Sequence, residues 1–158
     1  MKRYELEHII RAASDITNER DIVIIGSQAI LAQFPDADPG LLESIEADIF
    51  PLHRPELAIE VDGAIGERSL FHGTHGYYAH GVDENTATLP EGWKQRLIPI
   101  RNQNTRNATG WCLEVHDLAV SKLVAGREKD VEYIIVGYSS RKGTCDAAWG
   151  SQNIAAGY

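Results

Sequence analysis

Apolar residues recur at helical spacing in four segments of the chain. The first series predicts an amphipathic helix over residues 4–19, because its members follow the i, i+3, i+4, i+7 rule: Leu6, Ile9, Ile10, Ala13 and Ile16. Similar spacing after Pro55 predicts a helix that ends at Gly66. Further along, two helices are expected over residues 116–125 and 128–136, and Gly126 separates them.

Short stretches with strand character lie between these helices. Residues 22–25 form a β-branched run that stops at Gly26, which is typical of a strand buried on both faces. Residues 44–50 alternate between apolar and polar positions, so Glu46 and Asp48 are expected on the same face of a strand. Three more short strands are expected around residues 77–82, 97–100 and 111–113.

The order of these elements indicates a fold class. Helices that interleave with short strands favour an α/β (α+β) domain, in which helices flank a small mixed sheet. The length of 158 residues fits one domain, which we place at residues 1–136. From residue 137 onward neither the helical nor the strand period is found, so an irregular C-terminal tail is expected over residues 137–158.

Composition narrows the class of protein. With 43% hydrophobic and 24% charged residues, the chain is unlike disordered, collagen-like or coiled-coil proteins. No apolar run approaches the roughly 18 residues of a membrane-spanning helix, so no membrane partner is expected. The two cysteines, Cys112 and Cys145, form no CxxC pair, which favours neither a disulfide framework nor a zinc ribbon. A cytoplasmic protein is expected.

Charge is unevenly distributed along the sequence. The net charge of −8 argues against a protein that coats nucleic acid through bulk positive charge. Residues 1–93 carry 6 basic and 17 acidic side chains, whereas residues 94–158 carry 9 basic and 6 acidic ones. Two interpretations stay open at this point: carboxylates and cations on opposite walls of one cleft, or two surfaces with different decoration.

A first candidate site combines Gly26-Ser27 with the Glu46-x-Asp48 pair. A Gly-Ser turn after a strand, at the start of a helix, offers a hydroxyl, backbone N–H groups and a positive helix end to a phosphate. Two carboxylates two residues apart on a strand point the same way and can share Mg²⁺. Each half alone has a simpler interpretation, as a turn or as a solvated face.

A second candidate is Lys122, within the expected helix over residues 116–125. If Leu118, Leu123 and Ala125 are buried, Lys122 leaves the helix at another angle and can point into a cleft as a charge for phosphate. The alternative is a lysine whose stem covers apolar surface while its ammonium stays in water, with Asp117 as a helix cap.

These segments together resemble one family. Gly26-Ser27, Glu46-x-Asp48 and the stretch from Asp117 through Lys122 and Arg127 to Asp130 are similar to the hallmarks of the DNA polymerase β-like minimal nucleotidyltransferases, AbiEii-toxin-related proteins in particular. The resemblance covers about residues 20–133. The sequence departs from the usual pattern in four places: the first metal position is Glu46 rather than Asp, 18 residues separate Ser27 from Glu46, the third carboxylate is not obvious, and the tail is unlike the helix usual there.

The resemblance implies a nucleotidyltransferase-like fold and a set of roles. Gly26 and Ser27 would hold the triphosphate of an NTP, Lys122 would steady phosphates or the acceptor, and Glu46 and Asp48 would hold Mg²⁺ and be catalytic. An acceptor hydroxyl, on an RNA such as tRNA or on a protein, would attack the α-phosphate and release pyrophosphate. The resemblance further implies a toxin–antitoxin or phage-defence role, with a cognate antitoxin as partner.

The third catalytic group has two candidates, Asp83 and His80. Asp83 lies near the end of an expected strand, and His80 is expected within that strand and can act as a base.

Two other functions remain open from the sequence. One is a catalytically inactive interaction module that keeps the nucleotidyltransferase fold. The other is a zinc-binding protein that uses His72, His75 and His80, three imidazoles within nine residues. A glycine-rich aromatic segment such as this is also compatible with a packed loop that lines the cleft, with His80 or Tyr77 near the substrate.

Overall fold

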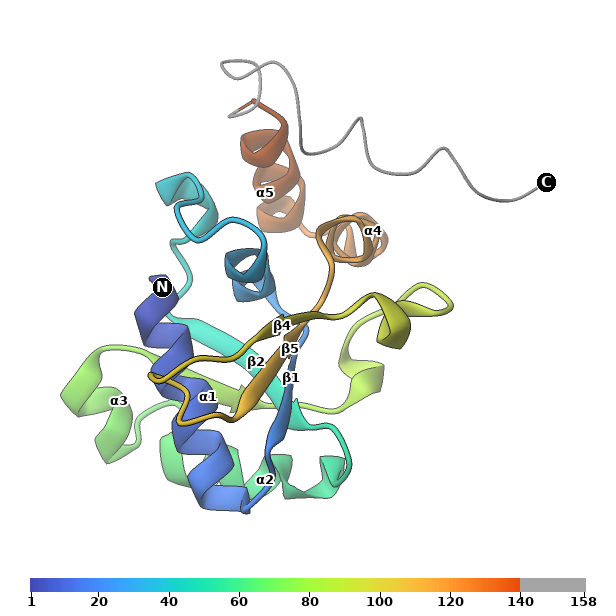
Figure 1. Cartoon of the computed structure of the whole chain (residues 1–158). Helices are drawn as coiled ribbons and strands as arrows, with labels where there is room; N and C mark the ends of the chain where they lie inside the picture. Colours follow the sequence, from blue (N-terminus) through green and yellow to red (C-terminus); the bar gives the residue numbers. More distant parts are fainter. Residues whose placement is uncertain (140–158) are drawn as a thin grey trace.

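The structure, a computed structural model, describes residues 1–139 and is built around one five-stranded mixed sheet (Figure 1). The strand order is β3-β2-β1-β5-β4. The strands are β1 (Asp21–Ile24), β2 (Glu46–Pro51), β3 (Tyr78–Gly81), β4 (Ile98–Ile100) and β5 (Thr109–Cys112). Strand β1 pairs antiparallel with β2 and parallel with β5, β2 pairs parallel with β3, and β4 pairs antiparallel with β5. The predicted α/β (α+β) class with a mixed sheet is confirmed.

Within the described part of the chain, five α-helices surround the sheet: α1 (Arg3–Thr17), α2 (Ala58–Ile65), α3 (Leu70–His75), α4 (Val115–Ala125) and α5 (Glu128–Ser139). The connections contain 3-10 turns, among them η1 (Ser27–Ala32) and η4 (Glu84–Thr86). In Figure 1, α4 and α5 lie together at one end of the sheet and α2 lies toward the other. None of the helices within residues 1–139 is long and apolar enough to cross a membrane.

Strand β1 is buried on both faces, as its β-branched run predicts. Ile22 and Ile24 point into the main core, where α1 and α2 supply Leu6, Ile9, Ile10, Ala13, Val61 and Ile65. Val23 and Ile25 point to the opposite face, where Phe50 and Val82 pack with them and Leu89 and Trp93 cover them in part. Because burial of apolar surface on both faces is favourable, β1 is held at the centre of the sheet.

Strand β2 divides its side chains between core and solvent. Ala47 and Ile49 are fully buried in the main core, whereas Glu46 and Asp48 lie on the other face and are only partly covered. The period of two along a strand is the reason. Core packing of Ala47 and Ile49 therefore decides where both carboxylates point.

Two local predictions of secondary structure need correction. The segment before β3 contains a short helix, α3, which Ser69 caps through a hydrogen bond that its Oγ accepts from His72 N and which Gly76 ends in a left-handed conformation. Helix α5 continues to Ser139, so residues 137–139 are helical and not part of an irregular tail. The rest of the predicted tail, residues 140–158, lies outside the described residues.

The burial predicted for α4 is also wrong in part. Its buried residues are Val115, Asp117, Leu118 and Ser121, whereas Leu123 is 62% exposed and Ala125 is exposed too. Helix α4 packs against η1 and α5 instead of lying flat on the sheet, so only a narrow stripe of its surface contacts protein. The helix thereby turns a polar flank that includes Lys122 toward η1.

A close approach between α2 and β3 gives a test of this packing. A Cβ added at Gly81 would overlap the backbone carbonyl of Ala58, and backbone cannot move aside cheaply. We expect Gly81→Ala to lower the free energy of unfolding by about 1–3 kcal/mol, as overpacked sites do. Denaturant unfolding followed by circular dichroism measures the change.

The matched control is Gly63→Ala. Gly63 lies on α2, the helix that also contains Ala58, and a Cβ at Gly63 meets nothing within 4 Å. Alanine at this position should stabilise the protein by up to about 1 kcal/mol through its higher helix propensity. Equal stability losses in the two variants would contradict the packing described here.

Candidate functional site

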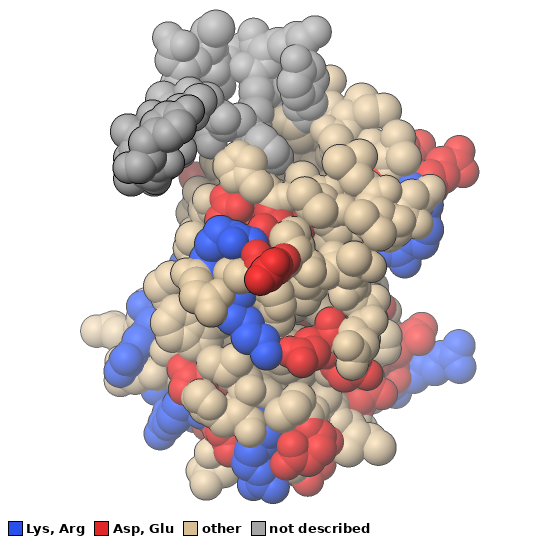
Figure 2. All heavy atoms as spheres, turned by 90° about the vertical axis from the view of Figure 1, so that its right-hand side faces the viewer, with Lys and Arg blue, Asp and Glu red and all other residues tan. Residues whose placement is uncertain are grey.

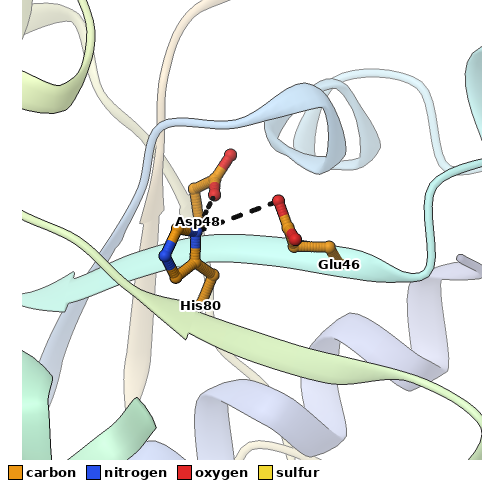
Figure 3. A group of neighbouring side chains, drawn as sticks. All are labelled: Glu46, Asp48 and His80. Carbon is orange, nitrogen blue, oxygen red and sulfur yellow. Dashed lines mark hydrogen bonds and ion pairs between the residues drawn. The ribbon is translucent and has the colours of Figure 1, made fainter. Parts of the chain in front are cut away.

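Four polar side chains form a ladder on the exposed face of β2 and β3, and Figure 3 shows three of them, Glu46, Asp48 and His80. The two strands are parallel, and their register places Glu46 beside Tyr78 and Asp48 beside His80. Residues that are partners across a ladder point to the same face of a sheet. Two of the residues singled out from the sequence, Glu46 and Asp48, are thus joined by a third, His80.

The polar atoms of this group converge. His80 Nδ1 lies 3.2 Å from Asp48 Oδ1 and 3.9 Å from Glu46 Oε1. The other oxygen of Glu46, Oε2, accepts a hydrogen bond of 2.6 Å from the Tyr78 hydroxyl. One ligand atom from each of Glu46, Asp48 and His80 lies within 4.8 Å of the others. The arrangement can hold a metal ion.

The electrostatics of the group favour a cation. Burial raises the pKa of Asp48, the nearby charge of Glu46 raises it further, and His80 opposes the shift. The hydrogen bond to Glu46 raises the pKa of Tyr78 well above its ordinary value, so this hydroxyl stays protonated as a donor. Two carboxylates that repel one another at a partly buried site are stabilised by a positive charge between them.

Gly26 fits this site because it has no side chain. A Cβ at this position would overlap the Asp48 carboxylate, whose Oδ2 lies against the glycine. The adjacent Ile25 N–H donates a hydrogen bond of 3.1 Å to the backbone oxygen of Asp48. This close approach brings the Gly26-Ser27 turn next to the carboxylates, as the sequence predicted for one site.

Ser27 begins η1, but this is a 3-10 helix of only six residues. The sequence-based argument that a helix dipole helps to hold phosphate is therefore weak here, because so short a helix has few aligned peptide units. What the turn offers is the Ser27 hydroxyl, whose Oγ accepts a hydrogen bond of 3.0 Å from Lys122 Nζ.

Lys122 belongs to a buried charge network on the opposite wall. Its Nζ also donates to Asp130 Oδ1 at 2.9 Å and lies 4.9 Å from the centre of the Tyr133 ring. Asp130 is fully buried and accepts a second hydrogen bond, of 2.6 Å, from Arg127 Nε. Tyr133 donates its hydroxyl to the Ser27 backbone oxygen at 2.8 Å, which ties α5 to the turn. Lys122 is thus held in place, and the alternative of a freely solvated lysine is wrong.

A cleft of about 920 Å³ lies between these walls. Its lining includes Gly26, Ser27, Glu46, Asp48, His80, Lys122, Arg127 and Asp130. The acidic first part of the chain and the basic second part therefore both contribute to one cleft. Figure 2 shows basic and acidic side chains interspersed on one face of the molecule, without a large patch of a single sign. The volume falls within the range of small-molecule sites.

Asp83 is not brought to this site. Its side chain caps η4 by accepting a hydrogen bond of 2.7 Å from Asn85 N, and it does not line the cleft. Of the two candidates for the third group, the structure places only His80 beside the carboxylates.

The three histidines proposed to bind zinc do not come together. His75 packs among the rings of His8, Phe71 and Tyr77, and His72 lies against the Tyr78 ring. Among the described residues, the one group of three ligating side chains is Glu46, Asp48 and His80. A zinc site made of His72, His75 and His80 is therefore contradicted by the fold, because the rings of His72 and His75 pack against aromatic neighbours and do not converge with His80.

Sequence reasoning missed Tyr78 and Tyr133 and gave no chemical role to Asp130. Tyr78 could have been found from the strand period, since it lies two residues before His80 and must share its face. Tyr133 had no comparable signal, because its contact with Ser27 depends on how α5 packs.

Comparison with protein-family models finds a match over residues 4–141 to the family described as nucleotidyltransferase of unknown function (DUF6036). The match covers most of the 158 residues, and the chain belongs to this family. Comparisons with curated proteins and with solved structures found no match. The family match confirms the resemblance to nucleotidyltransferases and names neither a substrate nor a partner.

The buried Asp130 gives a stability test of the opposite wall. Burial raises the pKa of Asp130, but hydrogen bonds from Arg127 and Lys122 outweigh burial and leave the pKa below its ordinary value. A carboxylate with a depressed pKa stabilises the folded state above the unfolded-state pKa, and the contribution is lost as pH falls through the folded-state value. We expect Asp130→Asn to lower the free energy of unfolding by about 3 kcal/mol at neutral pH.

Urea unfolding of both proteins between pH 7 and pH 3 measures this difference. It should stay constant down to the unfolded-state pKa of about 3.9 and shrink below it. The control, Asp15→Asn, removes an exposed ion pair with Arg106 and should cost about 0.5 kcal/mol or less. A cost at Asp130 no larger than at Asp15 would refute the role assigned to the buried carboxylate.

Proposed function

We propose that this member of the nucleotidyltransferase family is an active enzyme, which transfers a nucleotide from an Mg²⁺-bound NTP to a hydroxyl group of a macromolecular acceptor. One observation carries the proposal: a carboxylate pair, Glu46 and Asp48, shares a cleft with the Ser27 hydroxyl and the Lys122 ammonium. A cation site next to a phosphate site is what a metal–nucleotide complex requires.

The residues present fit a divalent cation. Carboxylate oxygens are hard ligands of the kind Mg²⁺ prefers. Burial, and after it the charge of Glu46, raises the pKa of Asp48, and a nearby cation would offset both effects. Glu46 and Asp48 would hold the ion, and it would supply charge stabilisation for the entering and leaving oxygens. Glu46 is longer than the Asp usual at this position, but its carboxylate is held in place by the hydrogen bond that one of its oxygens accepts from Tyr78.

Ser27 and Lys122 would bind the triphosphate. Lys122 Nζ has three protons to donate, and in the structure it donates to Asp130 and to Ser27 Oγ. Asp130 is buried beneath the cleft and keeps the ammonium at this wall while a phosphate oxygen takes a further proton. Arg127, whose side chain is 60% exposed, adds positive charge at the rim.

The reaction is an in-line displacement at the α-phosphorus. The acceptor oxygen forms a new P–O bond, the bond from the α-phosphorus to the oxygen that bridges the β-phosphorus breaks, and pyrophosphate leaves. The hydroxyl proton passes to solvent, which reaches the site because the side chains of Asp48 and His80 are 29% and 49% exposed. The chain contributes by positioning and by charge, which dominate catalysis of phosphoryl transfer.

Labelled nucleotides provide the test. Purified protein is incubated with each α-³²P-labelled NTP, Mg²⁺ and either total tRNA or cell extract, and the labelled products are separated as RNA or protein. We expect transfer by the wild type and at least about a 100-fold loss in Glu46→Gln and Asp48→Asn, since metal binding contributes several kcal/mol to the transition state.

Glu60→Gln is the matched control, because Glu60 is an exposed carboxylate on α2 that does not line the cleft. This variant should retain full transfer.

We further propose that the acceptor modification is toxic and that a cognate antitoxin opposes it. Expression of the wild type in a host cell should then slow growth, whereas expression of Asp48→Asn should not. Absence of label transfer with every NTP, together with absence of NTP binding by calorimetry, would leave an inactive interaction module as the better description.

Lys122 offers a separate test of nucleotide binding. Lys122→Met should weaken binding of a non-hydrolysable NTP analogue by about tenfold or more, the loss expected for one charge-assisted hydrogen bond. Calorimetry measures the dissociation constant. Lys94→Met is the control, since Lys94 is half exposed, pairs with Glu84 and lies outside the cleft. An unchanged affinity in Lys122→Met would remove this residue from the phosphate site.

A further inference from the structure

We propose that His80 is a metal ligand, and that a site of two carboxylates and one imidazole binds a transition-metal ion such as Mn²⁺ in preference to Mg²⁺. The inference deepens the proposed function and rests on it in placing the cation between Glu46 and Asp48. It gives His80 a role as ligand instead of the role of a base.

The structure directs one atom of each side chain to a common point. Tyr78 engages Oε2 of Glu46, which leaves Oε1 toward His80. Asp48 Oδ2 lies against Gly26, which leaves Oδ1 toward His80. His80 presents Nδ1 to both of these oxygens (Figure 3). Both carboxylates are thus oriented by a neighbouring residue, which is characteristic of a built metal site.

The separations of these atoms suit an octahedral ion. Ligands about 2.1 Å from a central ion lie about 3 Å apart in neighbouring positions and about 4.2 Å apart in opposite ones. The distance of 3.2 Å from His80 Nδ1 to Asp48 Oδ1 is close to the first separation, and the distance of 3.9 Å to Glu46 Oε1 lies between the two. Three ligands leave the other positions of the ion open for water and phosphate oxygens.

No lysine or arginine within residues 1–139 forms an ion pair with the two carboxylates. His80 is the one side chain there whose nitrogen lies close to an oxygen of Glu46 or Asp48. Lys122 and Arg127, which also line the cleft, are paired with Asp130. The buried Asp130 thus keeps both basic side chains away from the position that a metal ion would take.

The nitrogen ligand decides which ion is preferred. Mg²⁺ selects oxygen ligands and loses its water reluctantly, whereas imidazole nitrogen binds first-row transition metals. Mn²⁺ accepts carboxylate, water and phosphate oxygens in the same geometry as Mg²⁺, so a nucleotide can share it. Replacement of an oxygen ligand by His80 therefore favours Mn²⁺ without loss of the phosphate-binding positions.

Electron paramagnetic resonance tests the inference without nucleotide or acceptor. Metal-free full-length protein is titrated with Mn²⁺, and then Mg²⁺ is added as competitor. In the wild type we expect ¹⁴N modulation from a coordinated imidazole and displacement by Mg²⁺ only at a large excess. His80→Gln should remove the ¹⁴N signal and weaken Mn²⁺ binding by about tenfold or more, since even outer-shell partners of metal sites contribute that much.

Two further variants sharpen the result. His80→Asp restores an oxygen ligand, so it should shift the ratio of Mn²⁺ to Mg²⁺ affinity toward Mg²⁺ while metal binding persists. His53→Gln, at an imidazole that is 65% exposed and outside the cleft, should change neither the spectrum nor the affinities. Circular dichroism of each variant verifies that the fold is intact.

The outcomes separate this inference from the proposed function. A wild-type spectrum without ¹⁴N modulation, or an unchanged Mn²⁺-to-Mg²⁺ preference in His80→Gln, would overturn it even if the enzyme transfers nucleotides with Mg²⁺. Nitrogen coordination that disappears in His80→Gln would support it even if no transfer is detected in the labelling assay.

Discussion

The parallel pairing of β2 with β3 is the contact on which the rest of the site depends. Its register sets Asp48 beside His80 and Glu46 beside Tyr78, and the strand period then turns all four side chains to one face. Ala47, Ile49 and Ala79 hold the other face in the core without any exposed surface. A slip by one residue would bury the two carboxylates and expose this apolar set, so the core itself enforces the geometry of the site.

The second wall of the cleft depends on a buried charge. Asp130 lies beneath Lys122 and Arg127 and joins the beginning of α5 to the end of α4, while Tyr133 joins α5 to the Ser27 turn. Such a network fixes the positions of its side chains more than it raises the stability of the fold. The reason is that removing charges from water costs much of the free energy that their attraction contributes. Its consequence for chemistry is that Lys122 faces the carboxylates across the cleft without pairing with them.

Much of the fold could be predicted from the sequence because hydrophobic periodicity reports burial directly. The first helix and the five strands follow from their spacing, and the pairing of Gly26 with the Glu46-x-Asp48 strand was expected for one site. Helix α3 was missed because its length of six residues is too short to show a period. Leu123 was expected in the core since it is apolar. Helix α4 packs against η1 and α5, however, and the exposure of Leu123 depends on this packing with parts of the chain distant in sequence.

The sequence by itself determined the order of the strands and of the longer helices, the face shared by Glu46 and Asp48, and the nucleotidyltransferase resemblance that the family match supports. Only the tertiary structure decided between His80 and Asp83, separated His72 and His75 from the site, and bound Lys122 to Ser27 and Asp130. The physical reason is the separation along the sequence of the residues that interact. Side-chain direction along one strand is a local property of the backbone. The contact of His80 with Asp48 joins residues 32 positions apart, and that of Lys122 with Ser27 joins residues 95 positions apart, so both depend on tertiary packing.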